Sequence, residues 1–224
     1  NSLKIKDIVI SEANFNINHN SFNYINEYFN NKISNKKIQI RKSKIFLKKK
    51  NSSKDIITIA TINKLNFFFD EKKNVNKINL NGLIYNTRYD LILLKNIYGK
   101  KYTDIKIKFK NLGALVKSRI FQDQNNKNFY NGKASLNFPG SEINLKYKIQ
   151  DKLILMNSEK SSLNSTSLTY DGKISMSPFF YNLNINLDAL NALKFIQNIS
   201  RLKNLLDNRI MLNKKVNGKI IFNI

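Results

Sequence analysis

The sequence predicts a mainly β protein, a long antiparallel meander curved into an open groove. First, apolar residues recur at every second position in many short segments, which is typical of strands with one apolar and one polar face. Second, these segments follow one another at intervals of about 8–12 residues, the spacing of an all-β meander. Third, strands and helices do not alternate along the chain, so the pattern of a parallel α/β sheet is missing.

The pattern is clearest in residues 168–190. Residues 168–176 alternate as a strand, and 183–187 do so again after a break at Ser177-Pro178. Asp188 then provides an N-cap for a helix. The same alternation predicts further strands at residues 3–10, 14–18, 38–47, 56–69, 78–85, 89–97, 105–109, 115–121, 130–138, 143–149, 153–156 and 216–224. The strand at 38–47 is expected to be interrupted at residues 41–44.

One amphipathic helix is expected at about residues 188–210, near the C-terminus. Its leucines and isoleucines recur at spacings of three and four and form a stripe that packs against the sheet or, as the alternative, lies on a membrane surface. A short N-terminal helix over residues 21–30 is a further option, because Phe22, Ile25 and Phe29 have helical spacing.

A glycine preceded by Asn or Asp recurs in four of the predicted strands. Such a pair usually marks a two-residue hairpin turn. An unbroken strand instead places apolar residues on one face in every copy, with the glycine permitting a bend or a close approach. We favour the unbroken strand and keep the hairpin as the alternative; the strand-bend glycines are Gly82, Gly132, Gly172 and Gly218.

Length, charge and cysteine content narrow the class of protein. We expect the 224 residues to be a single β-groove segment, 1–224, of a longer protein, because the chain opens within a strand pattern and lacks an initiator Met. It has no cysteine and therefore no disulfide or thiolate metal site.

The net charge of +24 suggests an anionic partner. However, lysine greatly outnumbers arginine, which weakens a specific nucleic-acid interpretation and leaves compositional bias of an AT-rich genome as the alternative.

Signals of catalysis are nearly absent from the sequence. His19 is the single histidine, the carboxylates are scattered, and no phosphate loop, nucleophile elbow or dinucleotide fingerprint occurs. General acid–base and metal chemistry both require several such groups placed together. We therefore expect that the protein is not an enzyme, and that it has no catalytic residues, no metal and no cofactor.

The chain resembles the AsmA-like family. The resemblance rests on the serial strands with a central glycine, on the run GKISMSPFF at residues 172–180, and on the strand and leucine-rich segment that follow it. The opening LKIKDIVISEA at residues 3–13 is similar to that family's strand, short turn and second strand. The resemblance implies a repeating β-groove related to bridge-like lipid-transfer proteins. It further implies a periplasmic location, an inner-membrane anchor outside this sequence and a role in outer-membrane biogenesis.

A one-faced sheet of this length agrees with that implication, because a single helix cannot cover its apolar side. Phospholipid acyl chains gain about 0.8 kcal/mol for each CH₂ removed from water, so such a face binds them without a specific site. The residues expected to line the lipid groove are Ile78, Leu80, Ile84, Ile105, Ile107, Phe109, Leu136, Ile143, Leu145, Tyr147, Tyr170, Ile174, Leu183 and Ile185.

Two other functions stay open at this point. The apolar faces of a structural scaffold or adhesin-like module would pack on each other in a closed core. A polyanion-binding module would use the positive charge, and its binding would weaken steeply with salt.

Overall fold

The computed structural model describes residues 7–17, 27–48, 56–84, 87–99, 101–123, 126, 129–164, 166–176, 179–188 and 218–223. Over these residues the protein is mainly β, as predicted, and the strands form an open meander. The chain divides into two compact units, residues 1–110 (unit 1) and 111–224 (unit 2). The expected single segment over residues 1–224 stays a prediction.

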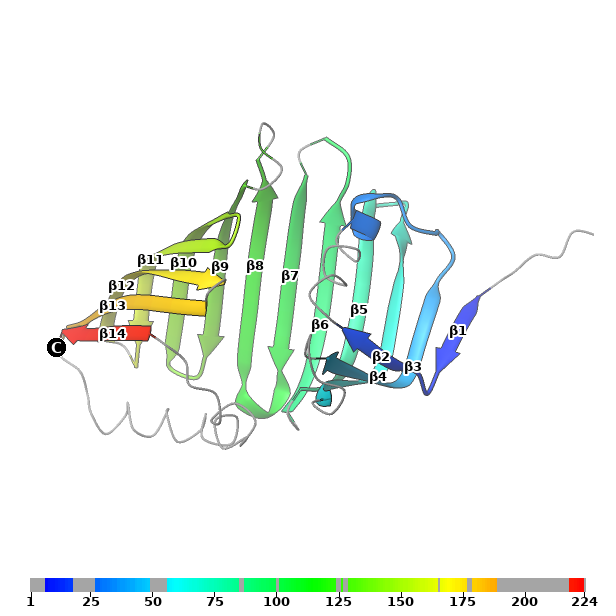
Figure 1. Ribbon diagram of the computed structural model, residues 1–224, viewed down its shortest axis with the longest axis horizontal. Coiled ribbons are helices and arrows are strands. Elements are labelled where there is room, and N and C mark those ends of the chain that lie inside the picture. The colour runs from blue at the N-terminus through cyan, green and yellow to red at the C-terminus, as the bar shows by residue number, and fades with distance from the viewer. Residues whose placement is uncertain are drawn as a thin grey trace, which may run out of the picture. The chain divides into compact units, whose positions relative to one another are not determined.

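Unit 1 contains seven described strands (Figure 1). They are β1 (Ile8–Ser11), β2 (Asn14–Ile17), β3 (Ile38–Lys48), β4 (Ile56–Asp70), β5 (Val75–Ile84), β6 (Thr87–Asn96) and β7 (Tyr102–Phe109). Their order in the sheet is β1-β3-β4-β5-β6-β7, with β2 also paired to β3. A short 3₁₀ turn, η1 (Lys110–Leu112), follows β7.

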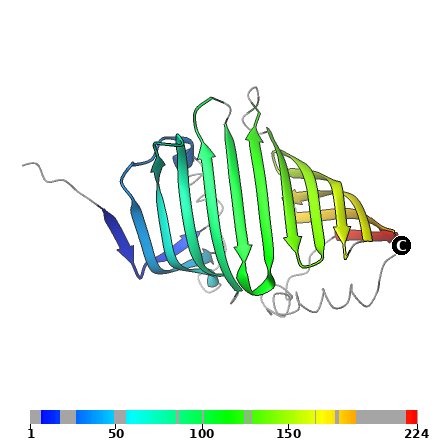
Figure 2. The same ribbon diagram turned by 180° about the vertical axis from the view of Figure 1, so that it is seen from behind.

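Unit 2 also contains seven described strands, seen from both sides in Figures 1 and 2. They are β8 (Ala114–Gln122), β9 (Phe129–Phe138), β10 (Ser141–Gln150), β11 (Leu153–Leu163), β12 (Thr166–Met176), β13 (Phe179–Leu187) and β14 (Gly218–Asn223). Each of these strands lies beside its neighbour in the sequence, so their spatial order is also their chain order.

The prediction of an antiparallel meander is wrong at three pairings. β1 and β2 both run parallel to β3, and β14 runs parallel to β13. Parallel neighbours require a crossover of about a dozen residues or more. Residues 18–37 and 188–217 provide connections of that length, whereas the short turns elsewhere produce antiparallel pairs.

The prediction that residues 41–44 interrupt the strand is wrong, because β3 is continuous across them. The chain instead accommodates Lys42 at a positive φ of 46°, and the neighbouring edge strand breaks at Glu12, with a φ of 59°. The Ser43 hydroxyl is buried and accepts the Ala13 N–H at 3.0 Å, which links the two irregularities. The kink therefore divides the edge strand into β1 and β2.

Only part of the helical prediction falls on described residues. The predicted helix at about 188–210 lies outside them except for Asp188. A helical turn occurs at residues 27–30, within the short N-terminal helix expected over 21–30.

Gly82, Gly132 and Gly172 lie inside continuous strands, whereas Gly218 is the first residue of β14. None of the three interior glycines forms the tip of a hairpin. The turns fall elsewhere, for example at Pro139-Gly140, where Gly140 has a φ of 77°.

Candidate functional site

In unit 1, the strand register gathers apolar side chains on one face of the sheet. Directly opposed residues on neighbouring strands share a face, so each chain of partners is one row across the sheet. One row is Ile38, Phe67, Ile78, Leu93 and Ile105. The next is Ile40, Leu65, Leu80, Leu91 and Ile107. A third is Ile62, Gly82, Tyr89 and Phe109.

Unit 2 has an apolar face built in the same way. One row is Ile120, Gly132, Tyr147, Met156, Gly172 and Leu183. Its neighbour is Tyr130, Ile149, Ile154, Ile174 and Tyr181. Shorter rows add Val116, Leu136 and Ile143, and also Tyr170 with Ile185. In each unit we call this surface the apolar face.

The structure thus places all fourteen predicted lipid-lining residues on the apolar face of their own unit. Six lie in unit 1 and eight in unit 2. All fourteen are partly exposed: none is among the buried hydrophobic residues, and none is among the strongly exposed ones. An apolar face packed inside a closed core would bury such side chains. The apolar faces therefore retain accessible hydrocarbon at these fourteen positions, although Ile40, Ile62 and Tyr89 in the same rows are buried.

The interior glycines of unit 2 accommodate side chains that lie across the sheet. The Tyr147 ring lies over Gly132, where an added Cβ would overlap it, and its hydroxyl is 2.7 Å from the Ser118 Oγ on β8. A Cβ on Gly172 would overlap the Leu183 side chain and lie 2.7 Å from the carbonyl oxygen of Asn182. The glycines therefore let large residues cover the backbone of the neighbouring strand.

Three tyrosines of these faces, Tyr89, Tyr147 and Tyr170, are largely removed from water. Tyr170 donates to the carbonyl of Asn144 at 2.9 Å, two strands away. Burial raises the pKa of Tyr147, Tyr170 and Tyr89 above the ordinary phenol value, because the charged form loses hydration. These side chains remain neutral at physiological pH and add apolar area to the face.

In unit 1 a segment of chain covers one end of the apolar face. The Asn76 side chain is fully buried, accepts the Ile33 N–H at 3.2 Å, and donates to the carbonyls of Phe29 and Asn31 at 3.0 and 2.7 Å. The Phe29 ring meets the Phe67 ring edge-on, with centroids 6.5 Å apart. Residues 27–34, which we call the end segment, are thereby fixed over the ends of β4 and β5.

The opposite face of each unit, which we call the polar face, carries lysine, arginine, asparagine and scattered acids. In unit 1 one row is Arg41, Lys64, Asn81, Asp90 and Lys108. In unit 2 one row is Arg119, Lys133, Lys146, Asn157, Asp171 and Asn184. The two faces therefore differ in chemistry in these rows, although the polar face also carries some large apolar side chains, such as Leu83 and Leu94 in unit 1.

The sequence reasoning missed several residues of the apolar faces, among them Leu65, Phe67, Leu91, Leu93, Met156 and Ile154. In β6 the run Leu91-Ile92-Leu93-Leu94 is apolar on both faces, so alternation does not distinguish them. In β4 a register shift between Ile62 and Lys64 changes which residues point to which face. Only the pairing partners identify these residues.

The described residues contain no group of three or more His, Cys, Asp or Glu side chains able to hold a metal ion. His19 lies outside the described residues. Among the helices that the structure describes, none has the length and hydropathy to cross a bilayer.

No protein-family model, curated protein or solved structure matches the chain.

Proposed function

We propose that the chain is a non-enzymatic lipid-binding and lipid-transfer segment that holds phospholipid acyl chains against its apolar faces. The supporting observation is the partial exposure of all fourteen lining side chains, in rows that continue from strand to strand. Hydrocarbon left in contact with water gains free energy when acyl chains cover it, by about 25 cal/mol for each Å² removed from water. Lipid headgroups would stay at the lysine-bearing edges.

The finer parts of the proposal follow from the resemblance stated above. The meander would curve into an open groove, with the helix expected at 188–210 against it. The protein would be AsmA-like, periplasmic, tethered to the inner membrane through a segment outside this sequence, and active in outer-membrane biogenesis. The contrast between one apolar and one lysine-rich face supports the groove, because such a sheet can offer hydrocarbon to acyl chains on one side while its other side contacts water.

Native mass spectrometry of the chain, purified gently from cells that contain membranes, tests the proposal. We expect phospholipid to co-purify with it. The double variant Leu80→Asn, Leu93→Asn places two amides on the apolar face of unit 1 and should reduce the bound fraction severalfold.

A matched control comes from the same two strands. Leu83 and Leu94 are also partly exposed leucines, but they pair with Arg88 and Lys77 on the polar face. The double variant Leu83→Asn, Leu94→Asn should therefore keep its lipid. A chain that is lipid-free as purified, or equal loss in both double variants, would contradict the proposal and favour the closed-core scaffold.

A further inference from the structure

The polar face of unit 2 carries a row of three cations on adjacent strands. Arg119 on β8 lies opposite Lys133 on β9, and Lys133 lies opposite Lys146 on β10. Like charges directly opposite each other in an antiparallel pair are destabilising. All three residues are exposed, and Lys117 and Lys148 lie on the same face two residues along from Arg119 and Lys146. Neighbouring like charges that cost stability in this way are expected where a surface has a function.

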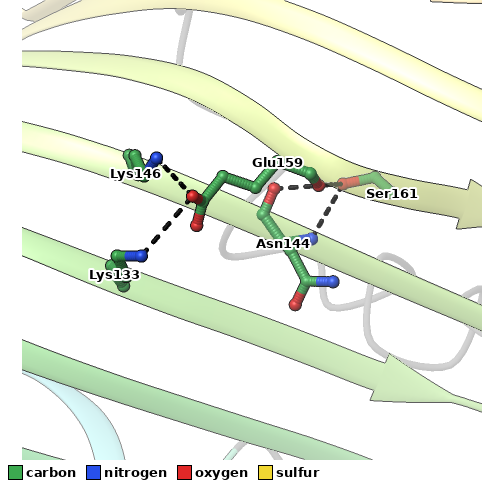
Figure 3. A network of polar contacts seen from close by, with 5 residues as sticks. All are labelled: Lys133, Asn144, Lys146, Glu159 and Ser161. Carbon is green, nitrogen blue, oxygen red and sulfur yellow. Dashed lines mark hydrogen bonds and ion pairs between the residues drawn. The ribbon is translucent and has the colours of Figure 1, made fainter.

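One carboxylate approaches two members of the row, as Figure 3 shows. Glu159 Oε1 lies 2.5 Å from Lys146 Nζ and 3.5 Å from Lys133 Nζ. The hydrogen bond from Lys146 holds the pKa of Glu159 below its usual value, with Lys133 adding to the effect. One carboxylate lies beside both lysines, so Glu159 balances only part of their combined charge.

A bulge in β11 sets the position of this acid. The register of β11 shifts against both neighbours near residues 158–161. The buried Ser161 hydroxyl accepts the Asn144 N–H at 2.9 Å and lies 2.7 Å from the Glu159 carbonyl, so it replaces ladder bonds lost at the bulge. The network fixes Glu159 beside the lysines.

Large apolar side chains lie on the same polar face. Leu155 is 39% exposed and stands directly between Lys148 and Lys173 on the neighbouring strands. Phe180 is 38% exposed, and its row continues through Ser175 to Leu153. Exposed leucine and phenylalanine among lysines are typical of surfaces that insert into the headgroup region of a bilayer.

We propose that the polar face of unit 2 docks on an anionic bilayer surface. The row of Arg119, Lys133 and Lys146 contacts the lipid headgroups, while Leu155 and Phe180 enter the boundary between headgroups and acyl chains. A soluble polyanion would account for the cations but not for the two exposed apolar side chains. The docking is separate from acyl-chain binding, because it uses the opposite face of the sheet.

Co-sedimentation with phosphatidylcholine vesicles, with and without phosphatidylserine, tests this proposal. We expect binding only to the vesicles that contain phosphatidylserine. The triple variant Arg119→Gln, Lys133→Gln, Lys146→Gln should weaken binding about 100-fold. The double variant Leu155→Ser, Phe180→Ser should weaken it about tenfold at unchanged charge.

Two further variants distinguish placement from total charge. The triple variant Lys36→Gln, Lys72→Gln, Lys73→Gln removes the same charge from exposed positions in unit 1 and should bind nearly as the parent chain does. Glu159→Gln frees two lysines and should tighten binding about fivefold. A merely structural role for the ion pairs would not produce tighter binding.

Equal losses of vesicle binding in the two triple variants would overturn the proposal, because net charge alone would then explain binding. Unchanged vesicle binding by the Leu155→Ser, Phe180→Ser variant would also overturn it. Binding of the parent chain to a DNA oligonucleotide, with no binding to vesicles that contain phosphatidylserine, would assign the face to a soluble polyanion instead. Circular dichroism of each variant confirms that the strands persist.

Discussion

Gly82 in unit 1 and Gly132 in unit 2 belong to the same Asn-Gly pattern, yet their missing side chains serve different contacts. A Cβ on Gly82 would overlap the carbonyl oxygen of Thr61, which is backbone on β4. A Cβ on Gly132 would meet the ring of Tyr147, which is a side chain on β10. The first contact can be relieved only by moving a strand, whereas the second can be relieved by rotating a ring. The repeated motif thus has two structural uses.

The two units also shield the ends and backbone of their apolar faces differently. Unit 1 places the end segment over one end of its face through the buried Asn76. Unit 2 covers its glycine row with Tyr147 and Leu183, which belong to the strands themselves. Shielding by a separate segment depends on a few polar bonds, whereas shielding by strand residues depends on local packing.

The largest expected effect is that of Gly82→Ala. It should lower the free energy of unfolding by about 3 kcal/mol, because the methyl group overlaps backbone beside the register shift in β4. Urea unfolding followed by circular dichroism measures the change. Asn81→Ala, in the same strand but on the polar face, is the control. A loss for Gly82→Ala no greater than that of the control would refute the close approach.

Asn76→Ala should have the next largest effect, about 2 kcal/mol. It removes the bonds to the Ile33 N–H and to the carbonyls of Phe29 and Asn31 at a fully buried site. Limited proteolysis should then cleave within residues 27–34 before other described parts of unit 1. Protection of the end segment equal to that in the parent chain would show that Asn76 does not fix it.

Gly132→Ala should cost less than Gly82→Ala, about 1 kcal/mol, because the Tyr147 ring can rotate away. The same substitution in a Tyr147→Ala background should cost almost nothing. The difference is the coupling energy of a double-mutant cycle. Additive losses in that cycle would mean that the ring and the glycine do not interact.

The smallest expected effect concerns Glu159 on the polar face of unit 2. Its pKa is lowered in the folded protein, so the stabilisation by its ion pairs is present above the ordinary glutamate pKa and is lost as pH falls through the lower folded value. Lys146→Gln should raise the pKa of Glu159 toward its ordinary value. An NMR titration of the Glu159 carboxyl measures both pKa values. Identical titration curves in parent and variant would contradict the ion pair.

Much of the strand pattern could be predicted from sequence, because alternation is strong where one face contacts water. In β7 the apolar Ile105, Ile107 and Phe109 alternate with lysines, and the prediction identified their common face. In β10 the alternation of Ile143, Leu145 and Tyr147 with polar residues was equally clear. In such segments, the alternation along a single strand is enough to identify which residues share a face.

The rest depends on pairing between distant residues. β1, β2 and β14 pair in parallel with their neighbours, and the alternation within one strand does not show the direction of the strand beside it. The bulges in β4 and β11 shift the register by one residue, which changes the face of every residue beyond them. The Glu159 site depends on such a bulge, so single-strand periodicity did not reveal it.

Fluorescence quenching by brominated acyl chains tests the central claim most directly. The chain contains no tryptophan, so one introduced tryptophan is the sole indole reporter. Leu80→Trp lies on the apolar face, and Leu83→Trp lies on the polar face of the same strand. We expect lipid with brominated tails to quench tryptophan at position 80 strongly and at position 83 weakly. Equal quenching at both positions, or none at position 80, would contradict acyl-chain binding on the apolar face.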